Sequence, residues 1–312
     1  VAGDVVDVLV YKKKSSYAEA RTQRIVSPSA KRTAAVCSHF GTCGGCKWQN
    51  LSYDAQLQFK QKYVFDAFTR IGKLSFSEIP PVLPNSETYY YRNKLEFSFS
   101  NKKWLTAQQM QETENIANRD ALGFHIPGMF DKILDIDNCH LQQEPSNSIR
   151  NAVKEFALQR KLTFFDIRNK TGFLRTLMIR TASTGEVMVL LAVYEWLEKE
   201  LYELLDFLKE KFPDIASLQY THNSKANDTL QGLDIKTWYG RDHIIEQMEG
   251  LRFKISARSF YQTNSKQAYE LYKVTRNFAG LTGNEVVYDL YTGTGTIANF
   301  VARNAQKVIG IE

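Results

Sequence analysis

The spacing of hydrophobic and polar residues changes several times along the chain, and each change predicts a different element. Residues 4–11 alternate apolar and polar side chains, as a half-buried strand does, and a second strand-like stretch covers residues 20–26. A polar turn separates them at residues 12–17. Two or three strands are too few for a closed barrel, so we expect residues 1–35 to be part of a small β-unit.

The next periodic segment predicts a helix over residues 53–71. Apolar residues recur along one face of it, which predicts packing against a hydrophobic core rather than a site for a partner. These residues are Leu57, Val64, Phe68 and Ile71.

Between about residues 82 and 250 the pattern predicts mostly strands with a few helices. Residues 95–99 alternate cleanly, and residues 174–180 and 186–194 predict a hairpin across Thr184 and Gly185. Helical character is found at residues 151–160 and 197–211. We therefore expect a mixed α+β middle domain.

The last sixty residues follow a different order. They predict a helix, a strand, a glycine turn, a short helix and a second strand, which together form the opening half of a doubly wound α/β domain. The expected bounds are 265–279, with Gly280 as the stop, then 285–291, 297–303 and 307–311. Such sheets have about six strands, so we expect further strands beyond Glu312.

Composition narrows the class of protein. The 312 residues include 43% hydrophobic and 24% charged side chains, which is ordinary for a globular protein. No run of 18 apolar residues is present and no secretory signal opens the chain, so we expect a cytoplasmic protein with no membrane partner.

The net charge is +6, and most of the excess lies at the start of the chain. Such a basic surface attracts nucleic-acid phosphates, although a solvated lysine face is the alternative. Within residues 1–35, seven basic side chains face three acidic ones: Lys12, Lys13, Lys14, Arg21, Arg24, Lys31 and Arg32 against Asp4, Asp7 and Glu19.

Three of the four cysteines lie within ten residues. Cys37, Cys43 and Cys46 are spaced C-x(5)-C-x(2)-C, and Cys139 is the fourth. Four thiolates suit an iron–sulfur cluster or a tetrahedral zinc ion, and buried cysteines without a metal are a third interpretation. Structural zinc sites are usually built from two close pairs, so three local ligands and one remote ligand favour a four-iron cluster.

A strand followed by a glycine-rich turn lies at residues 286–296. Gly293 and Gly295 allow a tight bend and a close approach of the backbone to a ligand. Glu312 ends the following strand, where an acid can accept hydrogen bonds from ribose hydroxyls. The pattern also fits a dinucleotide-binding turn, so NAD is an alternative ligand.

Two side chains beside the turn favour S-adenosylmethionine over NAD. Asp289 ends the strand, where its carboxylate can face the ammonium group of the cofactor's amino-acid moiety. Tyr291 directly precedes the turn and can pack on the cofactor. Each residue also has a structural interpretation, because Asp289 can cap the turn and Tyr291 can belong to the core.

Several segments together resemble one known family. They are the cysteine loop at residues 37–49, the sequence YRNK at 91–94, the segment leading to Cys139, SFYQTN at 259–264 and DLYTGTG at 289–295. In this combination the chain resembles the bacterial RNA uracil-5-methyltransferases over nearly its whole length. The cysteine spacing together with the Gln262 motif is highly specific.

The resemblance implies a multidomain fold of α/β and α+β parts. Residues 1–35 would be part of an OB-like RNA-binding barrel of the TRAM type, and residues 36–250 a mixed α+β central domain that holds an iron–sulfur cluster. Residues 251–312 would be the N-terminal half of a Rossmann-like methyltransferase domain.

The resemblance also implies roles for individual residues. Gln262, Tyr291 and Glu312 would contact S-adenosylmethionine. A [4Fe–4S] cluster would be ligated by Cys37, Cys43, Cys46 and Cys139. RNA phosphates are expected to contact Lys12, Lys13, Lys14, Arg92 and Lys94.

The expected reaction forms 5-methyluridine. A cysteine thiolate adds to carbon 6 of uracil, and carbon 5 then attacks the activated methyl group. A base removes the carbon 5 proton, and the cysteine leaves carbon 6. In the family both catalytic groups lie in the second half of the catalytic domain, so we expect no catalytic residue within this chain.

Within the family, the chain looks more like the enzymes that act on large-subunit (23S) ribosomal RNA than like the tRNA branch, which characteristically lacks the cluster loop. We expect a monomer. The alternatives are a tRNA uracil-5-methyltransferase, an NAD-dependent iron–sulfur oxidoreductase, and a module that only binds RNA.

Overall fold

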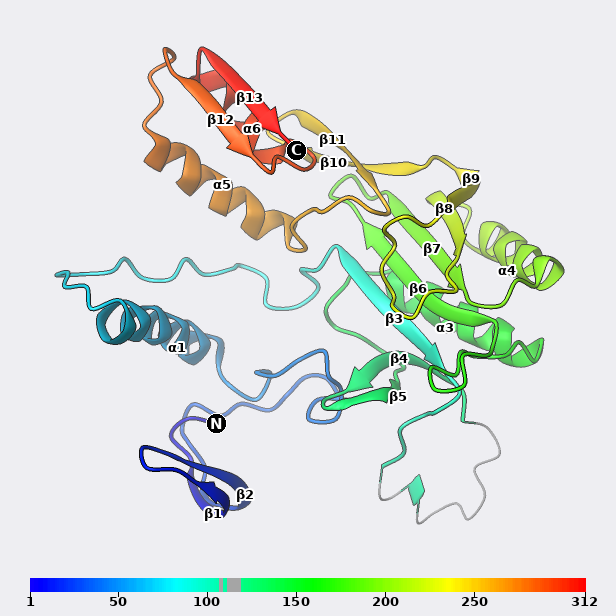
Figure 1. Cartoon of the computed structure of the whole chain (residues 1–312), viewed down its shortest axis with the longest axis horizontal. Coiled ribbons are helices and arrows are strands. Elements are labelled where there is room, and N and C mark those ends of the chain that lie inside the picture. Colours follow the sequence, from blue (N-terminus) through cyan, green and yellow to red (C-terminus); the bar gives the residue numbers. More distant parts are fainter. Residues whose placement is uncertain (107–108, 111–118) are drawn as a thin grey trace. The chain divides into compact units, whose positions relative to one another are not determined.

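The computed structural model describes residues 1–106, 109–110 and 119–312. These residues form two compact units (Figure 1). Unit 1 consists of Val1–Gly41 and Gly45–Thr88, and unit 2 of Thr42–Gly44 and Tyr89–Glu312. Among the described residues, no helix is both long enough and apolar enough to cross a membrane.

Unit 1 begins with an antiparallel hairpin of β1 (Val5–Lys13) and β2 (Ala18–Ser27). The base of the hairpin is closed by Asp4, whose carboxylate accepts hydrogen bonds from Arg32 Nε at 2.7 Å and from the Ser29 amide at 2.9 Å. The Arg32 guanidinium holds the pKa of Asp4 well below its usual range. The two strands expected from the alternating pattern are confirmed, and they form a two-stranded sheet.

The helix expected after the cysteine loop is present as α1 (Tyr53–Asp66), which continues as the π-helical turn η1 (Ala67–Ile71). Its predicted core-facing stripe is wrong. Val64, Phe68 and Ile71 are 38%, 46% and 82% exposed. The buried residue of α1 is Ala55. Phe68 contacts the ring of Phe76, with centroids 5.9 Å apart, but it stays largely exposed.

Unit 2 is built on a mixed seven-stranded sheet with the order β5-β4-β3-β6-β7-β8-β9 (Figure 1). Strands β7 and β8 are parallel neighbours joined by a helix, and the other neighbouring pairs are antiparallel. The strands are β3 (Lys94–Ser100), β4 (Ala121–Ile126), β5 (Met129–Asp135), β6 (Leu174–Thr181), β7 (Val187–Val193), β8 (Ile215–His222) and β9 (Ile235–Gly240).

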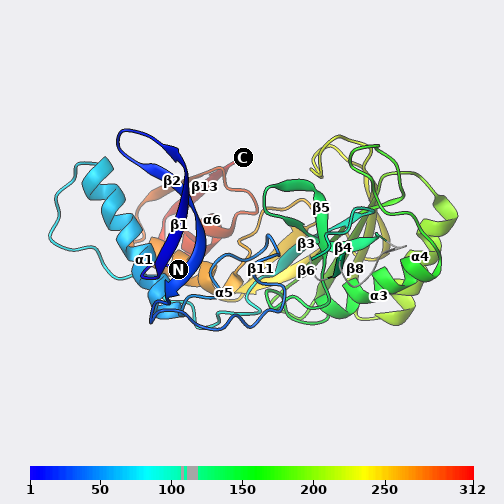
Figure 2. The same cartoon turned by 90° about the horizontal axis from the view of Figure 1, so that it is seen from below.

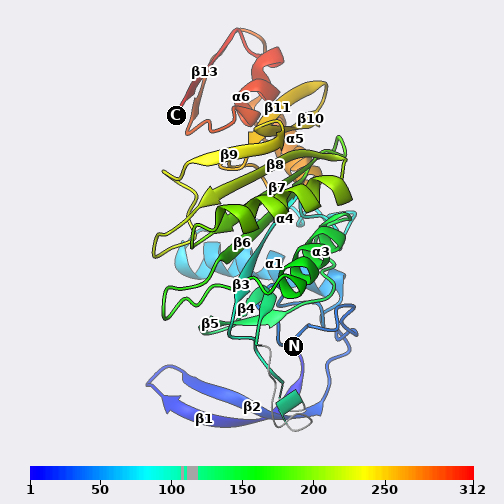
Figure 3. The same cartoon turned by 90° about the vertical axis from the view of Figure 1, so that its right-hand side faces the viewer.

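One face of this sheet is covered by α3 (Ser146–Gln159) and α4 (Glu198–Lys211), as Figure 3 shows. Phe97 of β3 is fully buried there, beneath the guanidinium of Arg150 from α3. The two helices touch through the stacked rings of Phe156 and Phe207, whose centroids are 4.7 Å apart. The sheet therefore has a complete hydrophobic core on this face.

The opposite face carries a second core. Met178, Met188 and Leu190 project from β6 and β7 into it, because side chains alternate between the two faces of a strand. The covering elements are the hairpin of β10 (His243–Met248) and β11 (Leu251–Ser256) together with the segment that follows.

The chain ends with α5 (Ser265–Ala279), β12 (Val286–Leu290), α6 (Thr296–Val301), the 3₁₀ turn η2 (Ala302–Asn304) and β13 (Lys307–Ile311), visible in Figure 2. Strands β12 and β13 are parallel, as expected for a strand–helix–strand unit. Asn264 caps α5 by accepting a hydrogen bond from the Gln267 amide, and Gly280 ends it in the left-handed conformation. The helix predicted at residues 265–279 and the strands predicted at residues 285–291 and 307–311 are confirmed.

Candidate cofactor site

The turn between β12 and α6 has a left-handed backbone at three positions. Tyr291, Gly293 and Gly295 have φ values of 61°, 56° and 72°. An aromatic residue rarely adopts this conformation, and such strain is found preferentially at functional sites. At Gly295 the positive φ favours glycine, and an added Cβ would lie 2.9 Å from Asn299 Nδ2, so that side chain would have to shift.

Asp289 holds the turn from inside. Its Oδ2 accepts a hydrogen bond from Thr292 Oγ1 at 2.8 Å and another from the Ala298 amide at 3.0 Å. This is the capping interaction that the sequence left open for Asp289. The carboxylate fixes the path of the backbone through the turn.

Glu312 lies on the other side of the turn. Its Oε2 accepts a hydrogen bond from the Gly293 amide at 2.7 Å, and the Thr292 amide donates to the Ile311 carbonyl at 3.0 Å. Tyr291 is 92% exposed, so it is not a core residue. The structure therefore brings five of the six residues predicted to bind the cofactor to the carboxyl ends of β12 and β13: Asp289, Tyr291, Gly293, Gly295 and Glu312.

The sixth, Gln262, lies in the segment between β11 and α5. This segment is anchored to the large sheet, because Asn93 Nδ2 donates to the Gln262 carbonyl at 2.8 Å. Helix α5 in turn contacts α6, where the Tyr272 and Phe300 rings are 5.9 Å apart. Gln262 and the glycine turn are thus attached to one hydrophobic core.

None of the four cysteines forms a disulfide. Cys37 and Cys46 belong to unit 1, and Cys43 and Cys139 belong to unit 2. Cys139 is buried, and its amide and carbonyl both bond the side chain of Asn147. The donor set has the chemistry that an iron–sulfur cluster needs. Within the described part of the chain, no three His, Cys, Asp or Glu side chains form a group that could hold a metal ion.

Gly44 fixes the middle of the cysteine loop against β4. Its amide donates to the His125 carbonyl at 3.1 Å, and a Cβ at this position would lie only 2.4 Å from the same oxygen. Any other residue would push the loop away from the strand. The glycine therefore sets the position of Cys43 in unit 2.

The residues predicted to contact RNA lie in both units. In unit 1, Lys12 is exposed at the end of β1 and pairs with Glu19 at 2.9 Å, and Lys13 and Lys14 follow it. In unit 2, Arg92 is half-buried and its amide donates to the Leu141 carbonyl. Lys94 forms an ion pair with Glu96.

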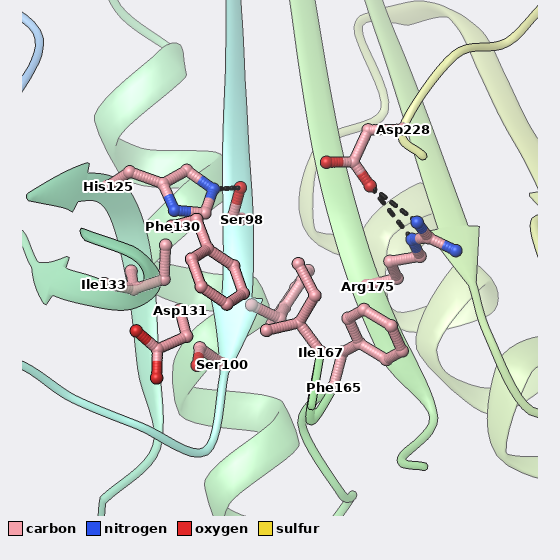
Figure 4. Close-up of a pocket in the computed structure, with 11 residues that line it drawn as sticks. Ser98, Ser100, His125, Phe130, Asp131, Ile133, Phe165, Ile167, Arg175 and Asp228 are labelled. Carbon is pink, nitrogen blue, oxygen red and sulfur yellow. Dashed lines mark hydrogen bonds and ion pairs between the residues drawn. The ribbon is translucent and has the colours of Figure 1, made fainter. Parts of the chain in front are cut away.

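A separate pocket opens beside β3, β4 and β6 (Figure 4). Ser98 Oγ and His125 Nε2 lie 3.4 Å apart on one side of it, and Arg175 donates to Asp228 Oδ1 at 3.0 Å on the other. Arg175 is buried and also donates to three backbone carbonyls of the loop after β8. Its role is to hold that loop, and none of the predicted cofactor residues or cysteines lines the pocket.

Sequence reasoning missed three polar residues near Gln262: Asn93, Arg180 and Tyr261. Asn93 stands inside the YRNK motif, between the two basic residues that were assigned to RNA. Because its side chain is uncharged, Asn93 could have been predicted to form a hydrogen bond within the protein rather than to contact RNA. Nothing in the local pattern identified Arg180, because its partners are remote in sequence.

The comparisons with known proteins agree with this geometry. An uncharacterized RNA methyltransferase of Bacteroides thetaiotaomicron is 53% identical over 315 residues, which cover 100% of this chain and 69% of the relative. The chain belongs to the RNA methyltransferase family. A second RNA methyltransferase, from Porphyromonas gingivalis, is 52% identical and covers 99% of this chain and 68% of its own length. No protein-family model matches the chain.

A solved structure is similar to this RNA methyltransferase over most of its fold. The tRNA (uracil-54, C5)-methyltransferase of Pyrococcus abyssi, in complex with S-adenosyl-L-homocysteine, superimposes with a TM-score of 0.70 at 26% identity. The match covers 98% of this chain and 66% of that protein. The mixed α/β fold with a large central sheet is therefore one that a methyltransferase of known structure shares.

Proposed function

We propose that this RNA methyltransferase transfers a methyl group from S-adenosylmethionine to carbon 5 of uracil in RNA. The observation that carries the proposal is the strained glycine turn after β12, closed by Asp289 and Glu312. The likeness over 98% of the chain to a uracil C5-methyltransferase that binds S-adenosyl-L-homocysteine supports it. Family membership favours this cofactor over NAD.

The residues of the turn have separate tasks in this proposal. Gly293 and Gly295 leave their backbone open to the cofactor, and Tyr291, which is exposed, packs on it. Glu312 accepts hydrogen bonds from the ribose hydroxyls. Asp289 acts through the turn, because its carboxylate bonds Thr292 and Ala298.

Gln262 completes the proposed cofactor site from the segment before α5. The cofactor supplies an electrophilic methyl group when it is bound. The chain's own contribution is to bind and orient the cofactor, because no residue of this chain is assigned to attack the uracil or to remove its proton.

We further propose that the RNA is 23S ribosomal RNA. The cysteine loop at residues 37–49 supports this choice, because the resemblance links that loop to the ribosomal branch. The alternative substrate is tRNA, which the name of the Pyrococcus abyssi enzyme favours. Phosphates would be contacted by a TRAM-like unit within residues 1–35 and by the start of β3, through Lys12, Lys13, Lys14, Arg92 and Lys94.

We also propose that Cys37, Cys43, Cys46 and Cys139 ligate a [4Fe–4S] cluster. The spacing of the three local cysteines and the fact that none of the four forms a disulfide support this. The role proposed for the cluster is to tie Cys139, in the segment after β5, to the cysteine loop.

The test uses the full-length protein with labelled S-adenosylmethionine and two RNA substrates, unmodified 23S ribosomal RNA transcripts and unmodified tRNA. We expect label at carbon 5 of uridine in the ribosomal transcript. Label in tRNA alone would support the alternative substrate. Label in neither RNA, from protein that binds S-adenosyl-L-homocysteine, would refute uracil methylation.

A further inference from the structure

The YRNK motif makes a junction between the large sheet and the Gln262 segment. Asn93 Nδ2 donates to the Gln262 carbonyl at 2.8 Å and to Ser265 Oγ at 2.9 Å. The Asn93 amide donates to the Thr263 carbonyl, also at 2.8 Å. One residue therefore bonds three positions of a segment that lies about 170 residues away in sequence.

The other side of this junction is held by two further bonds. Arg180 Nη2 donates to the Ser259 carbonyl at 2.6 Å. Ser265 Oγ donates to Glu246, a buried carboxylate that also accepts hydrogen bonds from two backbone amides. Residues 259–265 are thus tied to the sheet and to β10 on both sides of Gln262.

Three polar atoms at this junction are buried without a hydrogen-bond partner in the described part of the chain: Asn93 Oδ1, Arg180 Nε and Tyr261 OH. Arg180 and Tyr261 are 4% and 5% exposed. Burial lowers the pKa of Arg180 to about 10 and raises that of Tyr261 above its usual range. Buried polar atoms of this kind are nearly always satisfied in folded proteins, so a partner is required.

All three residues line the same small cavity, beside Glu246. Its volume is about 10 Å³, close to the minimum that one water molecule needs. The chemistry of the atoms also fits water. Asn93 Oδ1 accepts, Arg180 Nε donates, and the Tyr261 hydroxyl does either, so the partner must both donate and accept.

An anion fits the cavity less well. An anionic oxygen would accept from Arg180, but it would face the Asn93 oxygen and the Glu246 carboxylate. The amide of Asn93 cannot be reversed to remove this conflict, because its Nδ2 already donates to the Gln262 carbonyl. A single water with three protein partners matches what buried waters usually have.

We infer that Asn93, Arg180 and Tyr261 bind one buried water molecule, and that this hydrated junction positions the Gln262 segment for the cofactor. The inference rests on the proposed function, since it assumes that Gln262 contacts S-adenosylmethionine. Asn93 is a positioning residue in this scheme. It bonds the backbone of the segment and leaves the Gln262 side chain to the ligand.

The test compares Asn93→Ala and Tyr261→Phe with the unchanged protein, all as the full-length chain, in calorimetric titrations with S-adenosyl-L-homocysteine. Asn93→Ala removes two side-chain hydrogen bonds and one contact to the water, so we expect about tenfold weaker binding. Tyr261→Phe removes only a contact to the water and keeps the ring, so we expect about threefold weaker binding. Asn101→Ala, which removes a half-buried amide bonded to Asp166 instead, is the matched control and should bind normally.

Hydrogen exchange provides a readout that does not depend on the cofactor. Amides of residues 259–265 should exchange faster in both variants than in the control, and a high-resolution crystal structure should show one water within 3.2 Å of all three atoms. If the unchanged protein fails to bind S-adenosyl-L-homocysteine, the proposed function is wrong, and the exchange rates still decide the inference. If it binds, and both variants match the control in affinity and exchange, the positioning role is overturned while the proposed function stands.

Discussion

The cofactor turn and the cysteine set are both built from few residues, but they are held in different ways. The turn lies within residues 289–312 of one unit, and its side chains and amides already bond one another. The cysteines extend from residue 37 to residue 139 and belong to two units. Closing the short loop costs less chain entropy than joining distant segments. Local bonds can therefore shape the turn in advance, whereas the remote cysteine set would gain its order from the binding energy of the proposed cluster.

The largest effect is expected when one remote ligand is removed. Cys139→Ser should lower the iron content of anaerobically purified protein from about four atoms per chain to nearly none. A cluster held by three thiolates instead of four is expected to dissociate from the protein. Iron and sulfide analysis measures this. Cys37→Ser, from the other unit, should have the same effect. Stoichiometric zinc in protein made with iron available would contradict the cluster proposal.

A substitution in the glycine turn is expected to act differently, through strain in the backbone. Gly295→Ala places a Cβ at a left-handed position and 2.9 Å from Asn299 Nδ2. We expect the free energy of unfolding to fall by about 1–2 kcal/mol and the affinity for S-adenosyl-L-homocysteine to fall about tenfold or more. Urea unfolding and titration measure the two effects.

Gly250→Ala is the control for that variant. Gly250 has a φ of 78° in the β10–β11 hairpin, and no atom lies within 4 Å of its Cβ position. It should lose stability through backbone strain alone and keep its affinity. Equal affinities for the two variants would show that the turn does not bind the cofactor.

The basic residues of unit 1 should have a smaller effect that depends on salt. Replacing Lys12, Lys13 and Lys14 by Ala should weaken RNA binding and reduce the log–log salt slope by about 2, or about 0.7 for each lost phosphate contact. Filter binding over a range of salt concentrations measures the slope. The control replaces three lysines of α4, Lys199, Lys209 and Lys211, with the same change of charge. If both triple variants reduce the slope equally, the first set has no specific role.

The smallest effect concerns acid stability at the amino end of β12. Glu285 accepts hydrogen bonds from the Thr282 hydroxyl at 2.6 Å and from the amides of Thr282 and Gly283, and these bonds lower its pKa to about 2. A carboxyl whose folded pKa lies below its unfolded value stabilises the protein above about pH 4.3, and this contribution disappears as the pH falls toward 2.

Glu285→Gln should therefore be less stable than the unchanged protein at pH 6, and the difference should shrink toward pH 2. Urea unfolding at several pH values tests this, with Glu210→Gln on α4 as the control. A difference that stays constant with pH would show that the Glu285 charge does not matter.

The sequence by itself determined the local parts of this protein. Residues 265–279 form the predicted helix because its apolar period, its Asn264 cap and its Gly280 stop all act within a few residues. The turn at residues 291–295 follows from glycines that tolerate a positive φ, and the parallel β12–α6–β13 unit follows from the strand–helix–strand order.

Tertiary structure decided everything that depends on partners remote in sequence. The stripe predicted along residues 53–71 was wrong, because periodicity does not say whether a neighbour exists to cover an apolar face, and Ile71 is exposed. Asn93 stands in a basic motif, yet its side chain bonds a carbonyl 169 residues away. Arg180 and Tyr261 share a cavity only because β6 and the segment after β11 meet. Such contacts are set by which strands become neighbours, and no local pattern of side chains encodes that choice.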